Sequence, residues 1–155
     1  MLLTLNAENP SRALAYVRVS SQRQVDEGVS IEAQIKRIKE YARYKGLEIS
    51  DRDIIIEEGV SGGVPIWERP AGRHLKTRLK TGRYPHILTM RLDRMFRLVP
   101  DALTTVDELA DAGISLHVVD MNGEAIDTST SLATALALVD DEFKPFMIED
   151  AVKRA

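Results

Sequence analysis

A serine and an arginine stand two residues apart at the end of an apolar run, in the segment "ALAYVRVSSQRQ" at residues 13–24. Successive side chains of a strand point to opposite faces, so Arg18 and Ser20 would point the same way and Ser21 the other way. Burial of a guanidinium in a strand costs free energy unless an anion or a carboxylate accepts hydrogen bonds from it. The spacing favours a phosphate that Arg18 and Ser20 meet at the strand end, and a structural Arg–Asp pair is the alternative.

A second group of charged residues occurs in "RLDRMFR", residues 91–97. If helical geometry begins there, Arg94 and Arg97 share a face, and Asp93 can reach Arg97 at a spacing of four. Several pre-placed cations stabilise the charge that builds on phosphoryl oxygens during attack on a phosphodiester. Together with a serine at the strand end, these residues favour attack by a hydroxyl on a phosphodiester.

Metal ions could stabilise the same charge, but the sequence offers no clear set of ligands. None of the three histidines has metal-ligand spacing, and the chain has no cysteine. The acidic pairs at 57–58 and 140–141 are expected on exposed faces or at helix ends. Arginines would then replace the metal ions, and no cofactor is expected.

Length and composition indicate one globular domain of 155 residues with a single core. The lack of cysteine and of any long apolar run predicts a cytoplasmic protein outside the membrane. The net charge of −3 conceals a strong asymmetry, because nine of the 21 Lys and Arg residues lie between Arg69 and Arg97 with Asp93 as the only acid. This segment is either a basic patch on the fold or simply a solvated basic helix.

Apolar periodicity and turn residues predict alternating strands and helices. Strands are expected at residues 13–19, 53–58, 86–92 and 114–120, and helices at 30–44, 70–81, 100–113 and from 129 onward. This alternation implies an α/β sandwich, a mostly parallel sheet with helices on both faces. Loops at the carboxyl ends of neighbouring strands would then bring the two charged segments together.

Four segments in this order resemble motifs in the catalytic domain of the serine site-specific recombinases, which include resolvases, DNA invertases and large serine integrases. They are "YVRVSSQRQ", "SIEAQ", "GVSGG" with "ERPAG", and "RLDRMFR". "GISLHVVD" and "IDTSTSLA" continue the resemblance, which covers residues 13–143. The resemblance implies a three-layer sandwich with a central, mostly parallel sheet of four to five strands, flanked by helices and followed by a C-terminal dimerisation helix.

The resemblance also implies roles for individual residues. Ser20 would cleave DNA and hold it as a 5′-phosphoserine ester without a metal ion, which conserves bond energy for rejoining. Asp93 would orient Arg94 or take part in proton transfer. The side chains around the scissile phosphate would be those of Arg18, Arg69, Arg94 and Arg97. Residues expected to support the site or to contact DNA are Tyr16, Gln24, Gln34, Glu58 and Arg78.

The same resemblance divides the chain into an N-terminal extension at 1–12, a catalytic domain at 13–128 and the start of the dimerisation helix at 129–155. The expected partner is double-stranded DNA, bound by a homodimer that becomes a tetramer in the synaptic complex. No DNA-recognition motif follows, so DNA binding by these residues should be weak, independent of base sequence and steeply dependent on salt.

One segment departs from the family pattern, because Lys144 and Pro145 stand where a Glu-Arg pair is expected. Proline inside a helix removes a backbone hydrogen bond, and the ring of Pro145 would clash with the carbonyl group of Asp141. The expected cost is about 3 kcal/mol. We therefore expect a kink or an end near Phe143, an altered dimer contact and impaired catalysis. The alternative is a natural break at Pro145, with Lys144 or Lys153 supplying the charge.

Two other functions fit parts of the pattern. A module that only dimerises or occupies DNA could share this fold without its chemistry. A metal-dependent nuclease could share the topology, and its cleavage would require a divalent cation, whereas the recombinase reaction would proceed in a chelator.

Overall fold

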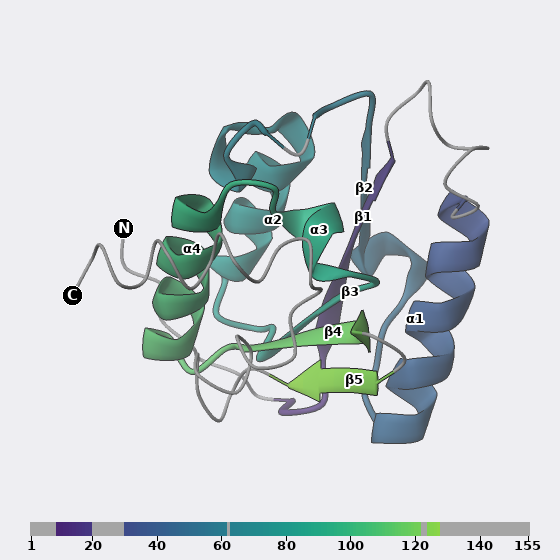
Figure 1. Ribbon diagram of the computed structural model, residues 1–155. Helices are drawn as coiled ribbons and strands as arrows, with labels where there is room; N and C mark the ends of the chain where they lie inside the picture. The colour runs from purple at the N-terminus through teal and green to yellow at the C-terminus, as the bar shows by residue number, and fades with distance from the viewer. Residues whose placement is uncertain (1–8, 20–29, 62, 122–123, 128–155) are drawn as a thin grey trace.

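The computed structural model describes residues 9–19, 30–61, 63–121 and 124–127, and they form a central five-stranded sheet in the order β2-β1-β3-β4-β5 (Figure 1). The strands are β1 (Ala13–Val19), β2 (Ile54–Glu58), β3 (His86–Thr89), β4 (Ser115–Met121) and β5 (Glu124–Asp127). The first four are parallel, and β5 pairs with β4 in the antiparallel direction. The predicted mostly parallel sheet is confirmed, and β5 is an additional strand that the periodicity did not reveal.

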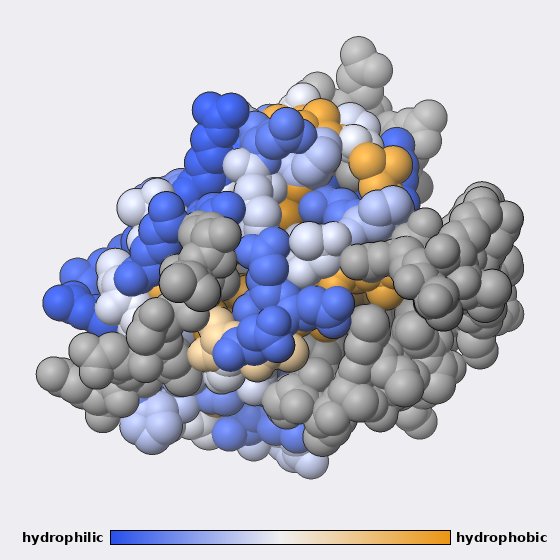
Figure 2. Space-filling view, turned by 90° about the vertical axis from the view of Figure 1, so that its left-hand side faces the viewer, coloured by the Kyte–Doolittle hydropathy of each residue, from blue (hydrophilic) through white to orange (hydrophobic). Residues whose placement is uncertain are grey.

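Helices cover both faces of the sheet, so the domain has three layers (Figure 1). On one face lies α1 (Ile31–Lys45), and on the other lie α2 (Pro70–Leu79), α3 (Leu92–Met95) and α4 (Val99–Asp111). Two short 3-10 helices, η1 (Asp51–Asp53) and η2 (Ile66–Glu68), occur in the connections. The described surface on the α2 and α4 side is mostly hydrophilic (Figure 2). Within the described ranges, no helix has both the length and the apolar character to span a membrane.

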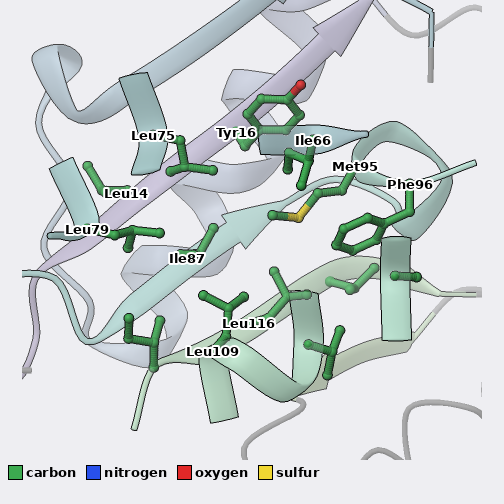
Figure 3. Packing of buried hydrophobic residues seen from close by; sticks show 14 of the residues in the cluster. Leu14, Tyr16, Ile66, Leu75, Leu79, Ile87, Met95, Phe96, Leu109 and Leu116 are labelled. Atoms are coloured by element: carbon green, nitrogen blue, oxygen red, sulfur yellow. The ribbon is translucent and has the colours of Figure 1, made fainter. Parts of the chain in front are cut away.

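The alternation predicted for β1 is present, and it separates two apolar clusters. Leu14 and Tyr16 belong to the larger cluster, which includes residues of α2, α3 and α4 (Figure 3). Ala15 and Val17 belong to the smaller cluster, on the α1 side. Because Arg18 follows Tyr16 at a spacing of two, its side chain leaves β1 on the side of the larger cluster.

Local sequence explains most helix boundaries. The Ser30 hydroxyl accepts a hydrogen bond from the backbone N–H of Ala33 and begins α1, and Gly46 ends it with φ of 70°. Proline in the first turn begins both α2 and α4. The strand predicted at 86–92 ends earlier, at Thr89, because the chain turns into α3 at Leu92. The dimerisation helix predicted from residue 129, with Lys144 and Pro145, lies outside the described residues.

Gly72 occupies the first turn of α2, where the helix packs tightly against η2. A Cβ at this position would lie 1.7 Å from the carbonyl oxygen of Ile66 and 2.8 Å from its carbonyl carbon. Helix propensity alone would favour alanine by about 1 kcal/mol. The clash involves backbone that cannot rotate away, so we expect Gly72→Ala to lower the free energy of unfolding by about 3 kcal/mol in a denaturant titration.

Gly63→Ala is the matched control, because a Cβ there would meet only the Ser61 hydroxyl, at 3.4 Å. Its effect should stay within about 0.5 kcal/mol. Equal losses for the two variants would contradict a specific clash at Gly72.

Candidate active site

Four arginines that the sequence singled out lie near one another around the carboxyl-terminal half of β1. Arg18, Arg69 and Arg94 are 4%, 0% and 7% exposed, and Arg97 is exposed. Burial lowers the pKa of Arg18 below its ordinary value. Nearby positive charges lower that pKa further, and they belong to Arg69, Arg94 and Arg97. The fold therefore concentrates positive charge around Arg18.

Arg18 donates hydrogen bonds to backbone carbonyls of two different segments. Its Nε donates to the carbonyl oxygen of Arg94 at 2.7 Å, and its Nη2 donates to that of Asp93 at 3.2 Å. Its Nη1 donates to the carbonyl oxygen of Val60, in the loop after β2, at 3.0 Å. Among the described residues the alternative Arg–Asp ion pair is not formed, since the Asp93 backbone takes the place of a carboxylate. The Arg18 guanidinium thus fixes α3 relative to β1 and the loop after β2.

The turn that carries Arg94 is shorter than a helix over 91–97 would be. α3 ends before Phe96, which is extended with φ of −133°. Arg97 lies beyond the helix, so the predicted helical relations of Arg97 to Arg94 and Asp93 are wrong. Asp93 instead accepts a hydrogen bond from Arg91 Nε at 3.3 Å. Complete burial of the Phe96 side chain in the larger cluster accounts for the change of backbone direction (Figure 3).

Arg69 and Tyr16 form a buried polar pair next to Arg18. Arg69 Nη1 donates to the Tyr16 hydroxyl at 3.0 Å, and Arg69 Nε donates to the carbonyl oxygen of Val64 at 2.7 Å. The Tyr16 hydroxyl donates to Glu57 Oε1 at 3.2 Å. Burial raises the pKa of Tyr16 to about 12, against the opposing effect of Arg69, so the hydroxyl keeps its proton at neutral pH.

Glu57 is buried, contrary to the expectation that the 57–58 pair lies on an exposed face. Its side chain is 3% exposed, and its carboxylate accepts the backbone N–H groups of Ala71 and Gly72 at the start of α2. Glu58 is exposed, as expected. The alternation of β2 was the available signal, because Glu57 follows the buried Ile55 at a spacing of two.

Comparison with known proteins identifies the family. The family model described as "Resolvase, N terminal domain" matches residues 13–154, most of the chain. The chain belongs to the serine recombinase family. Arg18, Arg69 and the 91–97 segment all lie within the residues that the family model matches.

Two curated relatives of this serine recombinase are similar over the same length. The chain is 32% identical to serine recombinase PinR of Escherichia coli strain K12 over 113 residues, which is 73% of this chain and 52% of PinR. It is also 32% identical over 113 residues to the Tn2501 resolvase of Escherichia coli, again covering 73% and 52% of the two chains. The chain spans about half the length of the curated relatives it matches.

Solved structures agree with the fold of this serine recombinase. The N-terminal catalytic domain of TP901-1 integrase superimposes with a TM-score of 0.71 at 30% identity, covering 92% of this chain and 96% of that one. A resolvase family site-specific recombinase from Streptococcus pneumoniae has a TM-score of 0.61 at 27% identity, covering 92% and 97%. The three-layer resolvase-like sandwich predicted from the sequence is confirmed.

The remaining residues predicted for the site fall in three places. Gln34 of α1 reaches the site, where its Nε2 donates to the carbonyl oxygen of Arg18 at 3.3 Å. Arg78 lies at the opposite end of the sheet, where it donates to the Asp53 carboxylate and the Tyr84 hydroxyl. Ser20 and Gln24 lie outside the described residues, so their roles stay predictions.

The described residues of the serine recombinase hold no group of three or more His, Asp or Glu side chains that could bind a metal ion. Two of the histidines, His86 and His117, instead lie within hydrogen-bonding distance of each other, with 2.9 Å between His86 Nδ1 and His117 Nε2.

Proposed function

We propose that this chain is the catalytic domain of a site-specific recombinase that cleaves and rejoins DNA through a 5′-phosphoserine intermediate, without a metal ion. The observation that carries the proposal is the convergence of three further arginines on Arg18, two residues before Ser20. Positive charge held in place before the reaction stabilises the charge that develops on the phosphoryl oxygens. Membership of the serine recombinase family supports the same reaction.

In this reaction the Ser20 hydroxyl oxygen forms a bond to phosphorus, and the bond from phosphorus to the 3′ oxygen of DNA breaks. The serine loses its proton and the leaving 3′ oxygen gains one, so a 5′-phosphoserine ester and a free 3′-hydroxyl result. Attack of a 3′-hydroxyl on the ester reverses these steps. One phosphate ester replaces another in each direction, so rejoining needs no other source of energy.

The four arginines would not contribute equally. Three of the five N–H donors of Arg18 are occupied by backbone carbonyls, so Arg18 mainly holds the turn of Asp93 and Arg94 in place. Arg97 is exposed and is therefore open to contact by DNA. This division assigns positioning to Arg18 and direct phosphate contact to Arg97 and to the guanidinium groups next to it.

The partner we propose is double-stranded DNA, bound by a homodimer that forms a tetramer during strand exchange. The nine cations between Arg69 and Arg97 support a DNA partner, since Lys and Arg contacts to phosphate supply most non-specific affinity. The homodimer and the tetramer follow from the family pattern, whose dimerisation segment lies outside the described residues.

Incubation with nicked, end-labelled duplexes of random sequence tests the reaction, because loss of the short nicked strand traps a covalent intermediate. We expect labelled DNA attached to the protein on a denaturing gel, in equal amount with magnesium and with excess EDTA. Cleavage that requires magnesium and leaves no adduct would indicate a nuclease instead. No cleavage and no adduct in either buffer would indicate a module that only occupies DNA.

A further inference from the structure

We propose that Glu57 is a positioning residue that fixes the Arg69 guanidinium through the Tyr16 hydroxyl. The proposal rests on the proposed function, in which Arg69 contributes charge next to the scissile phosphate. Glu57, Tyr16 and Arg69 are 3%, 0% and 0% exposed, so the link is shielded from water. In such surroundings a hydrogen bond is strong, and loss of one partner is costly.

The chemistry of the three groups allows only one direction for this link. A guanidinium only donates hydrogen bonds, so the Tyr16 hydroxyl accepts the bond from Arg69 Nη1. The Tyr16 hydroxyl donates its single proton to Glu57 Oε1, which leaves its lone pairs for Arg69 Nη1. The raised pKa of Tyr16, about 12, keeps that proton in place. The Tyr16 hydroxyl is therefore hydrogen-bonded to both groups, so the Glu57 carboxylate helps to fix the position of the Arg69 guanidinium.

The same carboxylate also holds the backbone from which the Arg69 side chain extends. Arg69 is the residue directly before α2, and Glu57 accepts the N–H groups of Ala71 and Gly72 at 3.0 and 3.1 Å. A carboxylate at the start of a helix is also favoured by the helix dipole. One acidic group therefore fixes both the main chain and the side-chain end of Arg69.

Glu57 is itself held in place by the sheet. It lies in β2 directly opposite Arg18 in the parallel register with β1, so its backbone is tied to the strand that carries the site. The Tyr16 ring packs among apolar side chains of the larger cluster, and its hydroxyl points away from them (Figure 3). Glu57 is therefore held by the sheet, and the Tyr16 ring is held by the larger cluster.

Hydrogen exchange at the Arg69 Nη1–H groups, one of which donates to Tyr16, tests the proposal in the full chain when followed by ¹⁵N NMR without DNA. We expect exchange in Tyr16→Phe and Glu57→Leu, which leaves no acceptor at residue 57, to be about tenfold faster than in the parent, the size expected for loss of one hydrogen bond. Arg69 exchange in the double variant should be no faster than in either single variant, because each of the three variants breaks the same hydrogen-bonded connection from Glu57 through Tyr16 to Arg69. Backbone amides of β3 serve as the internal reference for global opening.

Asp53→Asn is the matched control, because Asp53 is also a buried carboxylate, 3% exposed and hydrogen-bonded to Tyr84, but at the far end of β2. It should lower stability and leave Arg69 exchange unchanged relative to the β3 amides. The proposal would be overturned if Asp53→Asn accelerated Arg69 exchange as much as the Glu57 variant does. It would also be overturned if the accelerations of the two single variants multiplied in the double variant. If Glu57→Leu fails to fold, unchanged exchange in the nearly isosteric Tyr16→Phe variant would overturn it as well.

The covalent-adduct assay separates this proposal from the proposed function. We expect adduct formation in Tyr16→Phe and Glu57→Leu to slow by roughly 10- to 100-fold, with no further slowing in the double variant. If the parent forms no adduct while the exchange rates are coupled, the proposed function fails and the link to Arg69 stands. If the parent forms the adduct and exchange is uncoupled, the role of Glu57 is wrong.

Discussion

Ser20→Ala is expected to abolish the covalent protein–DNA adduct, and Ser21→Ala is expected to retain it. The alternation observed from Leu14 to Val17 sends Arg18 toward the arginine cluster, and Ser20 follows Arg18 at a spacing of two. Both serines lie outside the described residues, so the assignment rests on this alternation and on the family motif. Removal of a nucleophile costs far more than removal of a supporting group, so we expect a loss of at least about 10⁴-fold in rate.

The measurement is the trapped adduct on a denaturing gel, followed by mass spectrometry of the DNA-linked peptide. Thermal melting of both variants serves as the control for correct folding. Loss of the adduct in Ser21→Ala alone would reverse the assignment of the nucleophile.

Strand β1 shows which parts of the site the sequence could predict. Its side chains alternate between two apolar clusters, and apolar patterning is strong where both faces of a strand are buried. The convergence of Arg18 with the 91–97 segment followed from parallel strands, whose carboxyl ends meet at one edge. The first feature follows from local periodicity, and the second follows from the parallel topology that the alternation of strands and helices implies.

The hydrogen-bond partners of Arg18 and of Glu57 could not be predicted in the same way. Every residue carries a backbone carbonyl, so no residue type marks the three that accept from Arg18. Glu57 was expected on the surface because acidic residues are rarely buried without partners, and its partners are backbone N–H groups of a helix that lies later in the chain. The end of α3 likewise depends on the tertiary burial of Phe96.

Arg18→Lys is expected to be almost as damaging as Arg18→Ala, although lysine keeps the positive charge. The Arg18 guanidinium donates in three directions to carbonyls of Asp93, Arg94 and Val60, and a single ammonium cannot replace this planar fork. Buried carbonyls left without donors should lower the free energy of unfolding by about 3 kcal/mol. Displacement of the turn that carries Arg94 should slow adduct formation by roughly 10²–10³-fold.

Chemical denaturation and single-turnover adduct formation measure the two effects, and Arg97→Lys supplies the comparison. Arg97 is exposed, so its replacement should change the unfolding free energy by no more than about 0.5 kcal/mol, and any loss of rate would reflect contact with phosphate. If Arg18→Lys keeps both the stability and the rate of the parent, Arg18 acts only through its charge. A rate loss in Arg18→Lys with unchanged stability would instead place the Arg18 guanidinium directly on the phosphate, and the three carbonyl contacts would not be its main role.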